Sequence, residues 1–402
     1  MPELEKDARR WGVLGLLFLS LAVNLLDRQV LAVLAPVIRD ELHLSNTQYS
    51  YIVTSFLIGL TLAQVPSGML IDRIGARFGL PLLMMVWSAA NGLHAIARGV
   101  RDFCAFRFML GVGECGNYSA GVKAISQWFP ANERALAGGI FNAGTVIGSF
   151  VAPLIIVSLS SAYGWRMAFV VPSVLGLLWT LPWILFYRDR GQRPAGAESI
   201  ALAPLLAMRQ VWGAMLMRAM AGPVIHFYWY WLPEYLKRER GFSMEAIGML
   251  GGIPFLFAGI GNIGMGWFSG RLMRRGFSVD RALKTAFVIC GVLCLASSLV
   301  PAAPSEYLAL GLICAASLAL GGMAANHIGT LSNLFSPRVM ARITGLTGLC
   351  EGVVNIGLTL ATGAVVDRFG YYPVFLMAGL MPQLALAALF GLVRRVERVG
   401  PE

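Results

Sequence analysis

Charged side chains are scarce in this sequence of 402 residues, since Asp, Glu, Lys and Arg make up 13% of it against 57% hydrophobic residues. Soluble domains contain about 25% charged residues, so the chain lacks the polar surface that a water-soluble fold needs. It also lacks a nucleotide-binding Gly-x-x-x-x-Gly-Lys-Ser/Thr sequence, a nucleophile motif, and any His/Cys cluster with metal-ligand spacing. The sequence therefore predicts no enzyme, no metal and no cofactor.

The net charge of +11 does not indicate a nucleic-acid partner, because the basic residues fall in alternate loops and form no basic domain. Twenty Lys and Arg residues lie on the side of the two termini and eight on the opposite side. Cytoplasmic loops of membrane proteins carry an excess of Lys and Arg. This distribution predicts that both termini are cytoplasmic.

Hydrophobic blocks of about 20 residues, the length that a helix needs to cross a bilayer, follow one another along the whole chain. Short stretches with Gly, Pro and Arg separate them. The pattern predicts an all-α membrane protein with twelve transmembrane helices and membrane lipids as its surroundings. The expected spans are residues 12–38, 50–70, 79–97, 102–123, 135–160, 166–187, 211–236, 245–270, 282–300, 306–328, 341–365 and 372–393.

The longest polar interruption predicts a cytoplasmic linker over 188–210, between an N-terminal bundle (1–187) and a C-terminal bundle (211–402). An internal repeat supports this division, because Tyr163-Gly164-Trp165 before span 6 matches Phe369-Gly370-Tyr371 before span 12. We therefore expect two pseudo-symmetric six-helix bundles, the architecture of carriers that work by alternating access.

Four ionisable residues interrupt the apolar spans: Asp27 and Arg28 in span 1, and Arg107 and Glu114 in span 4. Each would cost about 2.5–3.5 kcal/mol at the centre of a bilayer, so they are expected to face one another or a wet cavity. Arginine binds carboxylates bidentately, which makes Arg28 the first candidate for a substrate's anionic group. Arg107 is expected to partner Asp27 or Glu114. Buried carboxylates titrate as their surroundings change, so Asp27 and Glu114 are the candidates for proton coupling.

The segment between spans 2 and 3 has the spacing Gly-x-x-x-Asp-Arg-x-Gly-x-Arg, which resembles the signature loop of the major facilitator superfamily. The resemblance covers all twelve spans and implies the major facilitator fold. In that superfamily the loop governs conformational switching, here by locking against the residues that follow span 4. The expected switch residues are Gly68, Asp72, Arg73, Gly75, Arg77, Glu133 and Arg134.

Five further motifs narrow the resemblance: Asn24-Leu25-Leu26-Asp27-Arg28, Gln64-Val65-Pro66-Ser67-Gly68, Arg107-Phe108-x-Leu110-Gly111-x-Gly113-Glu114, Gly116-Asn117-Tyr118, and Trp128-Phe129-Pro130 with Glu133-Arg134 through Asn142. With these motifs the chain resembles, within the superfamily, the anion:cation symporters, which include bacterial hexuronate and galactonate carriers. It departs from them at Leu60, where members usually have a substrate-facing tyrosine. The resemblance implies a monomer in a bacterial inner membrane.

Further candidate contacts to the substrate come from both halves. Asn117 and Tyr118 extend the polar stripe of span 4, and Glu351 and Asn355 lie one turn apart on span 11. Span 7 carries an aromatic run that reads either as an interfacial belt or as part of the cavity lining. The expected substrate-binding residues are Arg28, Arg107, Asn117, Tyr118, Asn142, Tyr228, Trp229, Glu351 and Asn355.

These observations predict a secondary active transporter that couples a small organic anion to protons by symport, with a sugar acid such as a hexuronate or aldonate as substrate. Two alternatives stay open. One is an exporter or antiporter of drugs or metabolites, which would not need Arg28 for neutral or cationic cargo. The other is a membrane sensor that binds its ligand without transporting it.

Overall fold

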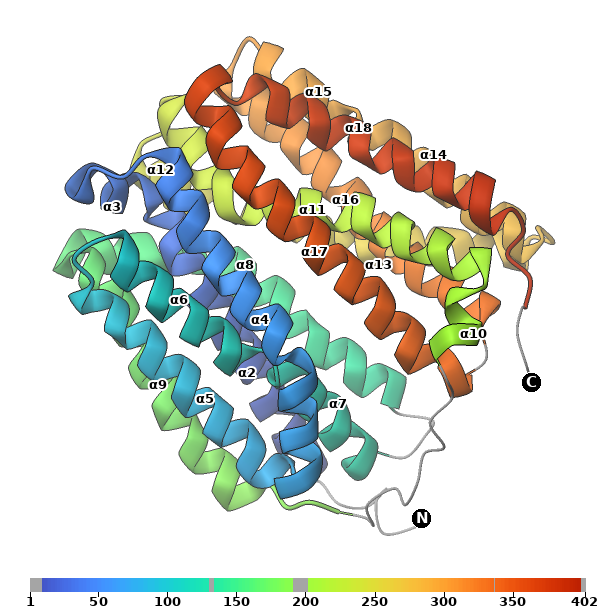
Figure 1. The fold of residues 1–402 in the computed structure, drawn as a ribbon, viewed down its shortest axis with the longest axis horizontal. Coiled ribbons are helices and arrows are strands. Elements are labelled where there is room, and N and C mark those ends of the chain that lie inside the picture. Colours follow the sequence, from blue (N-terminus) through green and yellow to red (C-terminus); the bar gives the residue numbers. More distant parts are fainter. Residues whose placement is uncertain (1–8, 130–133, 191–201, 336, 399–402) are drawn as a thin grey trace. The chain divides into compact units, whose positions relative to one another are not determined.

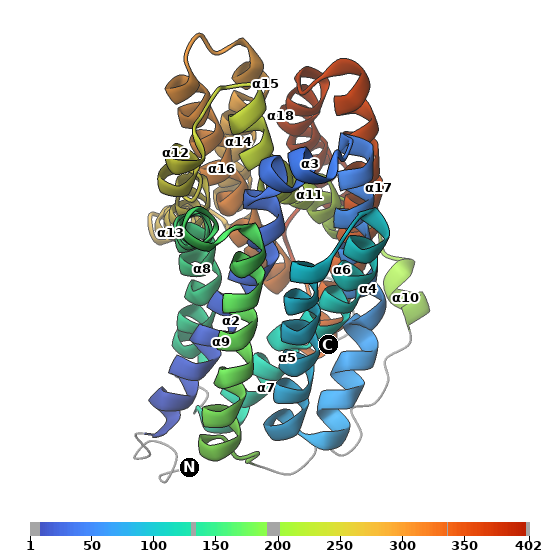
Figure 2. The ribbon, with the colours of Figure 1, turned by 90° about the vertical axis from the view of Figure 1, so that its left-hand side faces the viewer.

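The computed structural model describes residues 9–129, 134–190, 202–335 and 337–398. Within these ranges every regular element is a helix and no strand occurs (Figure 1, Figure 2). The predicted all-α class is therefore confirmed for this part of the chain. All twelve predicted spans fall on helices.

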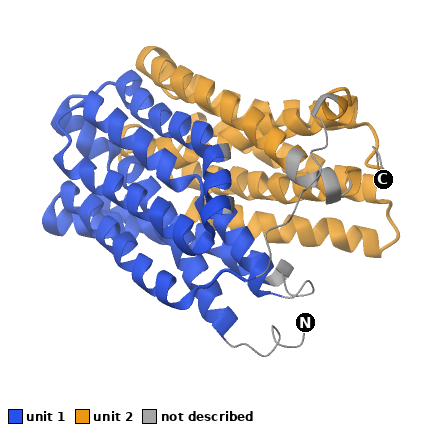
Figure 3. Ribbon diagram, turned by 60° about the horizontal axis from the view of Figure 1, so that its bottom comes forward, with its two compact units in different colours: residues 1–197, 243–252 blue, residues 198–242, 253–402 orange. Residues whose placement is uncertain are grey.

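The helices divide between two compact units (Figure 3). Unit 1 contains residues 1–197 and 243–252, and unit 2 contains residues 198–242 and 253–402. A short piece of the second half of the sequence therefore packs with the first half. The sequence-based boundaries at 187 and 211 stay a prediction about domains.

The helices of unit 1 are long, and several begin within a residue or two of the preceding helix. They are α2 (Arg9–Val33), α3 (Ala35–Leu42), α4 (Asn46–Ile74), α5 (Ala76–Leu93), η1 (His94–Ile96), α6 (Val100–Glu114), α7 (Asn117–Trp128), α8 (Arg134–Tyr163), α9 (Trp165–Phe186) and α12 (Met244–Leu250).

Unit 2 contains helices of similar length. They are α10 (Leu202–Leu206), α11 (Arg209–Arg238), α13 (Ile253–Arg274), α14 (Val279–Cys294), α15 (Ala296–Leu299), η2 (Val300–Ala302), α16 (Glu306–Leu334), α17 (Pro337–Phe369), α18 (Tyr372–Ala388) and the π-helical turn η3 (Leu389–Val393).

The two units pair their helices in the same way. In unit 1, α2 packs against α8, α4 against α6, and α5 against α9, a pair that lies side by side in Figure 2. In unit 2, α11 packs against α17, α13 against α16, and α15 against α18. Each unit thus joins its first span to its fifth, its second to its fourth and its third to its sixth. This common pattern is what a duplicated six-helix bundle requires.

Nine helices of the described residues are long and apolar enough to cross a membrane by length and composition. The other three predicted spans fall on α4, on α6 with α7, and on α11. Of these, α6 carries Arg107 and Glu114, and α11 carries Arg218 and His226. Charge alone does not decide this division, because α2 carries Asp27 and Arg28 and is among the nine, while α6 and α7 have only 15 and 12 residues.

Several predicted spans are broken inside the bundle. The fourth is interrupted at Cys115 and Gly116, one residue after Glu114, and the eighth at Gly251 and Gly252. A Cβ on Gly252 would press on the backbone of Phe150 in α8. Only glycine leaves room for α12 to end against α8 at this point.

Candidate functional site

The four predicted ionisable residues of spans 1 and 4 all lie in unit 1, on α2 and α6. The Arg28 Nε donates to the Glu114 Oε2 at 2.5 Å, which joins the two helices by an ion pair. The Glu114 side chain is fully buried, and that of Arg28 is 17% exposed. The sequence predicted Arg107 as a partner for Asp27 or Glu114, and Arg107 interacts electrostatically with both carboxylates, while Arg28 forms the ion pair with Glu114. A charge-assisted hydrogen bond of this kind makes removal of either partner costly.

Asp27 points away from this ion pair, into the contact between α2 and α5. It is fully buried, and its Oδ1 accepts a hydrogen bond from Asn91 Nδ2 at 2.8 Å. Asn91 also donates to the Phe169 carbonyl at 3.2 Å, which fixes its amide between α5 and α9. Asp27 interacts electrostatically with Glu114 and Arg107. The sequence reasoning missed Asn91, although an amide in the apolar span 79–97 was the signal that could have revealed it.

Phe56 of α4 brings the two arginines of the cluster to one aromatic ring. The Arg28 guanidinium carbon lies 5.2 Å from the ring centroid, and that of Arg107 lies 6.0 Å from it. Arg107 is only 2% exposed. The negative face of an aromatic ring stabilises a cation by about 0.5–1 kcal/mol at an exposed site and by about 2 kcal/mol or more where the cation is desolvated. Phe56 is therefore a second residue of the cluster that the sequence reasoning missed.

Two glycines of α6 explain how the cluster is assembled. A Cβ on Gly111 would come within 2.8 Å of the Leu60 backbone nitrogen in α4. A Cβ on Gly113 would come within 2.6 Å of the Trp87 backbone nitrogen in α5. Because α6 can approach both neighbours closely, its charged face lies next to α2, α4 and α5 instead of facing lipid.

The cluster has a simple charge balance. With all four groups ionised, Asp27 and Glu114 cancel Arg28 and Arg107, so the buried site is neutral in net charge. A monoanion that enters such a site adds one uncompensated negative charge to a medium of low dielectric constant, which is costly. Neutrality is kept when a proton enters with the anion.

The other predicted contacts of unit 1 are not gathered with the cluster. Asn117 is buried and bonds Ser20 twice, by accepting from its hydroxyl at 3.0 Å and donating to its carbonyl at 3.3 Å. Tyr118 is 54% exposed and stacks on Phe141 with a centroid distance of 5.8 Å. Asn142 is exposed. Asn117 thus connects α2 to α7, while Tyr118 and Asn142 lie on an open surface of the unit.

The predicted contacts of unit 2 lie on α11 and α17. Tyr228 is fully buried and shares a hydrogen bond with Ser297, so it packs inside the unit. Trp229 is half-buried, with its ring centroid 5.0 Å from that of His226. Glu351 forms an ion pair with Arg218, and Asn355 is buried one turn further along α17. The sequence reasoning placed Glu351 among the substrate contacts but did not predict its pairing.

The prediction that the switch residues between spans 2 and 3 form a loop is wrong. Residues 68–74 continue helix α4, α5 starts at Ala76, and only Gly75 lies between the two helices. Gly75 turns the chain with φ of +83°, a conformation that residues other than glycine rarely adopt. Its amide donates to the Ile71 carbonyl and ends α4. One glycine is thus enough to make the turn that the sequence assigned to a longer loop.

The lock that the sequence predicted for this region falls largely outside the described residues. Glu133 is not described, and nothing is described of the side chains of Asp72 and Arg134. The described part shows another contact. The Asp189 carboxylate accepts hydrogen bonds from the backbone amides of Ala76 at 3.0 Å and Arg77 at 3.2 Å. The chain that follows α9 therefore caps the N-terminus of α5.

Replacing Asp189 with alanine is expected to lower the free energy of unfolding by about 1 kcal/mol, because two amides at the start of α5 lose their acceptor. Asn is expected to restore part of that loss, since its side-chain oxygen still accepts. Denaturant unfolding of the purified protein, followed by tryptophan fluorescence, measures both. An alanine variant as stable as the parent would show that Asp189 does not act as this cap.

Comparison with known proteins places this geometry in a family context. Residues 17–356 match the family model described as Major Facilitator Superfamily. The chain is 29% identical over 388 residues to the hexuronate transporter of Escherichia coli strain K12, which covers 91% of this chain and 90% of that protein. It is 30% identical over 333 residues to the galacturonate transporter of Dickeya chrysanthemi, with 77% and 96% covered.

Among solved structures, the chain is similar to a bacterial homologue of the human lysosomal transporter Spinster in an inward-facing, unoccupied conformation. The TM-score is 0.78 at 22% sequence identity, with 97% of this chain and 96% of that chain covered. At this level of identity the similarity shows the fold alone.

Proposed function

Because the chain belongs to the major facilitator superfamily, we propose that it carries a small organic anion across a bacterial inner membrane in symport with a proton. The family and its curated relatives are membrane transporters, so the chain is a multi-pass transporter and the prediction that it is not an enzyme is confirmed. The resemblance to the hexuronate and galactonate branch is confirmed by the same relatives and by the D-galactonate transporter of Escherichia coli O6:H1, at 27% identity.

The observation that carries this proposal is the neutral cluster of two guanidinium groups and two carboxylates on α2 and α6. Arg28 is the substrate anchor, because it is the more exposed partner in the ion pair with the buried Glu114. When Glu114 takes up a proton, it stops competing for the Arg28 Nε, and the substrate carboxylate takes its place. Arg107 and Asp27 balance each other's charge while this exchange occurs.

The substrate that fits this chemistry is a sugar acid of the hexuronate or aldonate type. The relatives named for hexuronate, galacturonate and D-galactonate support this class. A single carboxylate on a polyhydroxylated chain needs one anchoring guanidinium and several neutral hydrogen-bonding groups. A monomer with both termini in the cytoplasm, alternating between two access states, completes the proposal.

Uptake by proteoliposomes tests the function. D-galacturonate is expected to accumulate when the pH is lower on the side from which it enters, and a sodium gradient alone is expected to drive none. Apolar cations are expected not to compete, because Arg28 repels them. Accumulation driven by sodium would overturn proton coupling, and competition by apolar cations would favour the exporter alternative.

A further inference from the structure

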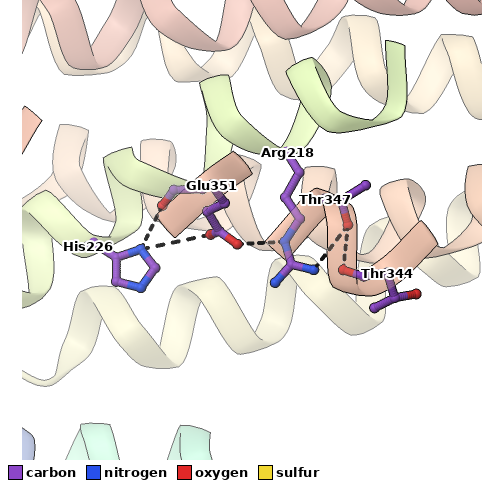
Figure 4. A network of polar contacts seen from close by, with 6 residues as sticks. Arg218, His226, Thr344, Thr347 and Glu351 are labelled. Atoms are coloured by element: carbon purple, nitrogen blue, oxygen red, sulfur yellow. Dashed lines mark hydrogen bonds and ion pairs between the residues drawn. The ribbon is translucent and has the colours of Figure 1, made fainter. Parts of the chain in front are cut away.

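Unit 2 contains a second ion pair of arginine and glutamate, half-buried, which the proposed function does not use. Figure 4 shows Arg218 of α11 facing Glu351 of α17. The Arg218 Nε lies 2.5 Å from the Glu351 Oε2. The other carboxylate oxygen, Oε1, lies 4.0 Å from the His226 Nδ1. The pair has the same atoms and the same distance as Arg28 and Glu114 in unit 1.

The Arg218 guanidinium is only partly used by its neighbours. Besides the Nε contact, Nη1 donates weakly to the Thr347 hydroxyl at 3.4 Å, and within the described part of the chain Nη2 has no hydrogen-bond partner. The Arg218 side chain is 35% exposed, twice as much as that of Arg28. A guanidinium presents five N–H donors in a planar fork, so its outer Nη1/Nη2 edge is open to a second carboxylate.

The helix that carries Arg218, α11, also leaves space for the Glu351 carboxylate. A Cβ on Gly222 would collide with the Glu351 Oε1, so the absence of a side chain there makes room for the carboxylate. Gly348 lies beneath the guanidinium, where a Cβ would be 3.7 Å from the Arg218 Nη1. The pair therefore occupies a space that α11 and α17 both leave open.

A buried histidine on a third helix is within the electrostatic influence of Arg218. His327 of α16 is 7% exposed, and among the described residues neither of its ring nitrogens has a hydrogen-bond partner. A buried polar group without a partner is unfavourable. The imidazole therefore has hydrogen-bonding capacity that no described residue uses.

The charge balance of this cluster decides which ligand fits. The titratable and charged groups that face Glu351 in the described residues are Arg218 and His226 from α11, with His327 from α16 beyond Arg218. With both histidines neutral, the cluster has no net charge. An anion on Arg218 therefore competes with the Glu351 carboxylate for the same guanidinium.

We propose that Arg218, Thr347 and Glu351 form a second carboxylate-binding site in unit 2, in which a bound carboxylate displaces Glu351 from the Arg218 guanidinium. The inference rests on the proposed function, because the carboxylate belongs to the transported class of sugar acids. Two sources supply it: the second carboxylate of a dicarboxylic sugar acid, or the carboxylate of a second molecule. His226 lies on the side of Glu351 opposite Arg218, and its Nδ1 is hydrogen-bonded to the Gly222 carbonyl at 3.0 Å (Figure 4).

Binding to two variants of the same ion pair tests the site. Arg218→Gln is expected to weaken carboxylate binding by about tenfold to a hundredfold, because a charge-assisted hydrogen bond is lost. Glu351→Gln removes the carboxylate that competes for Arg218 and is expected to strengthen binding by about tenfold. Calorimetry with galactarate and galacturonate on the purified full-length protein measures these changes.

The affinity is expected to change in opposite directions in the two variants, which distinguishes a binding site from a structural ion pair. If the pair is only structural, both variants bind more weakly than the parent, or neither changes its affinity. Either result would overturn the proposal. The double variant Arg218→Gln with Glu351→Gln guards against misfolding, since it leaves no unpaired buried charge. It is expected to bind as weakly as Arg218→Gln alone. Lys284→Gln with Asp280→Asn, which removes a 2.8 Å ion pair of α14 in the same unit, is the matched control and should bind as the parent does.

The choice of probe identifies the source of the carboxylate. If galactarate binds more tightly than galacturonate and Arg218→Gln removes the difference, the second carboxylate of one molecule fills the site. If galacturonate binds with two molecules per chain and the variant keeps one, a second molecule fills it. If the parent protein shows neither of these two binding patterns, the proposed site is wrong. The Arg28→Ala variant distinguishes a failure of this second site from a failure of the proposed function. If the proposed function is wrong, the Arg28→Ala variant still binds sugar acids as the parent protein does.

Discussion

Replacing Glu114 with glutamine is expected to abolish the accumulation of sugar acid against its gradient while leaving substrate exchange intact. Glutamine resembles a permanently protonated glutamate, so Arg28 becomes available to the substrate but the proton step is lost. In the parent protein a pH difference of one unit drives about tenfold accumulation when one proton moves with each anion. In the variant the expected ratio of inside to outside concentration is about one.

Proteoliposomes separate the two activities. Net uptake under a pH gradient measures coupling, and the exchange of labelled for unlabelled substrate at equal pH measures binding and movement. Glu41→Gln is the matched control, because Glu41 pairs with Arg166 at 2.9 Å on the same unit with 44% of its side chain exposed. It should behave as the parent does. Proton-driven accumulation by the Glu114 variant would remove Glu114 from the coupling step.

Replacing Arg28 with alanine is expected to reduce sugar-acid affinity by about a hundredfold, because the substrate carboxylate loses its charged partner. The buried Glu114 also loses its partner in this variant, which costs about 3–5 kcal/mol of stability if it stays ionised. Arg28→Ala combined with Glu114→Gln avoids that loss and is expected to show the same weak binding.

Isothermal titration with galacturonate measures the affinity of both Arg28 variants. Arg28→Lys keeps the charge but loses the planar fork, so an intermediate affinity is expected. Arg166→Ala removes an exposed arginine from unit 1 and serves as the control, with parental affinity. An Arg28→Ala variant whose dissociation constant equals that of the parent would show that the anchor lies elsewhere.

Position in a helix explains which site residues could be predicted. Arg107 and Glu114 are seven residues apart, so they share one face of α6, and this follows from 3.6 residues per turn. Their partners could not be found in this way, since periodicity says nothing about which neighbour a face meets. Phe56 and Asn91 belong to α4 and α5, and an aromatic ring or an amide in an apolar span has no distinctive spacing.

The turn at Gly75 and the cap at Asp189 show the same limit for local structure. Gly75 and the charged residues around it indicated a loop of several residues. The predicted loop was too long because a single glycine with positive φ can turn the chain between two helices. Asp189 lies 113 residues from Ala76 and accepts a hydrogen bond from the Ala76 backbone amide. A cap supplied from so distant a segment leaves no trace in the sequence next to the helix.

The sequence by itself determined the helical class, the positions of twelve spans and the presence of costly charges within them. This is because a bilayer demands about 20 apolar residues for each crossing and penalises every ionised side chain that it contains. Only the tertiary structure decided that Arg28 pairs with Glu114, across 86 residues, and Arg218 with Glu351, across 133. Those pairings depend on how closely particular helices approach, and the approach is set by glycines whose contacts exist only after the helices have packed.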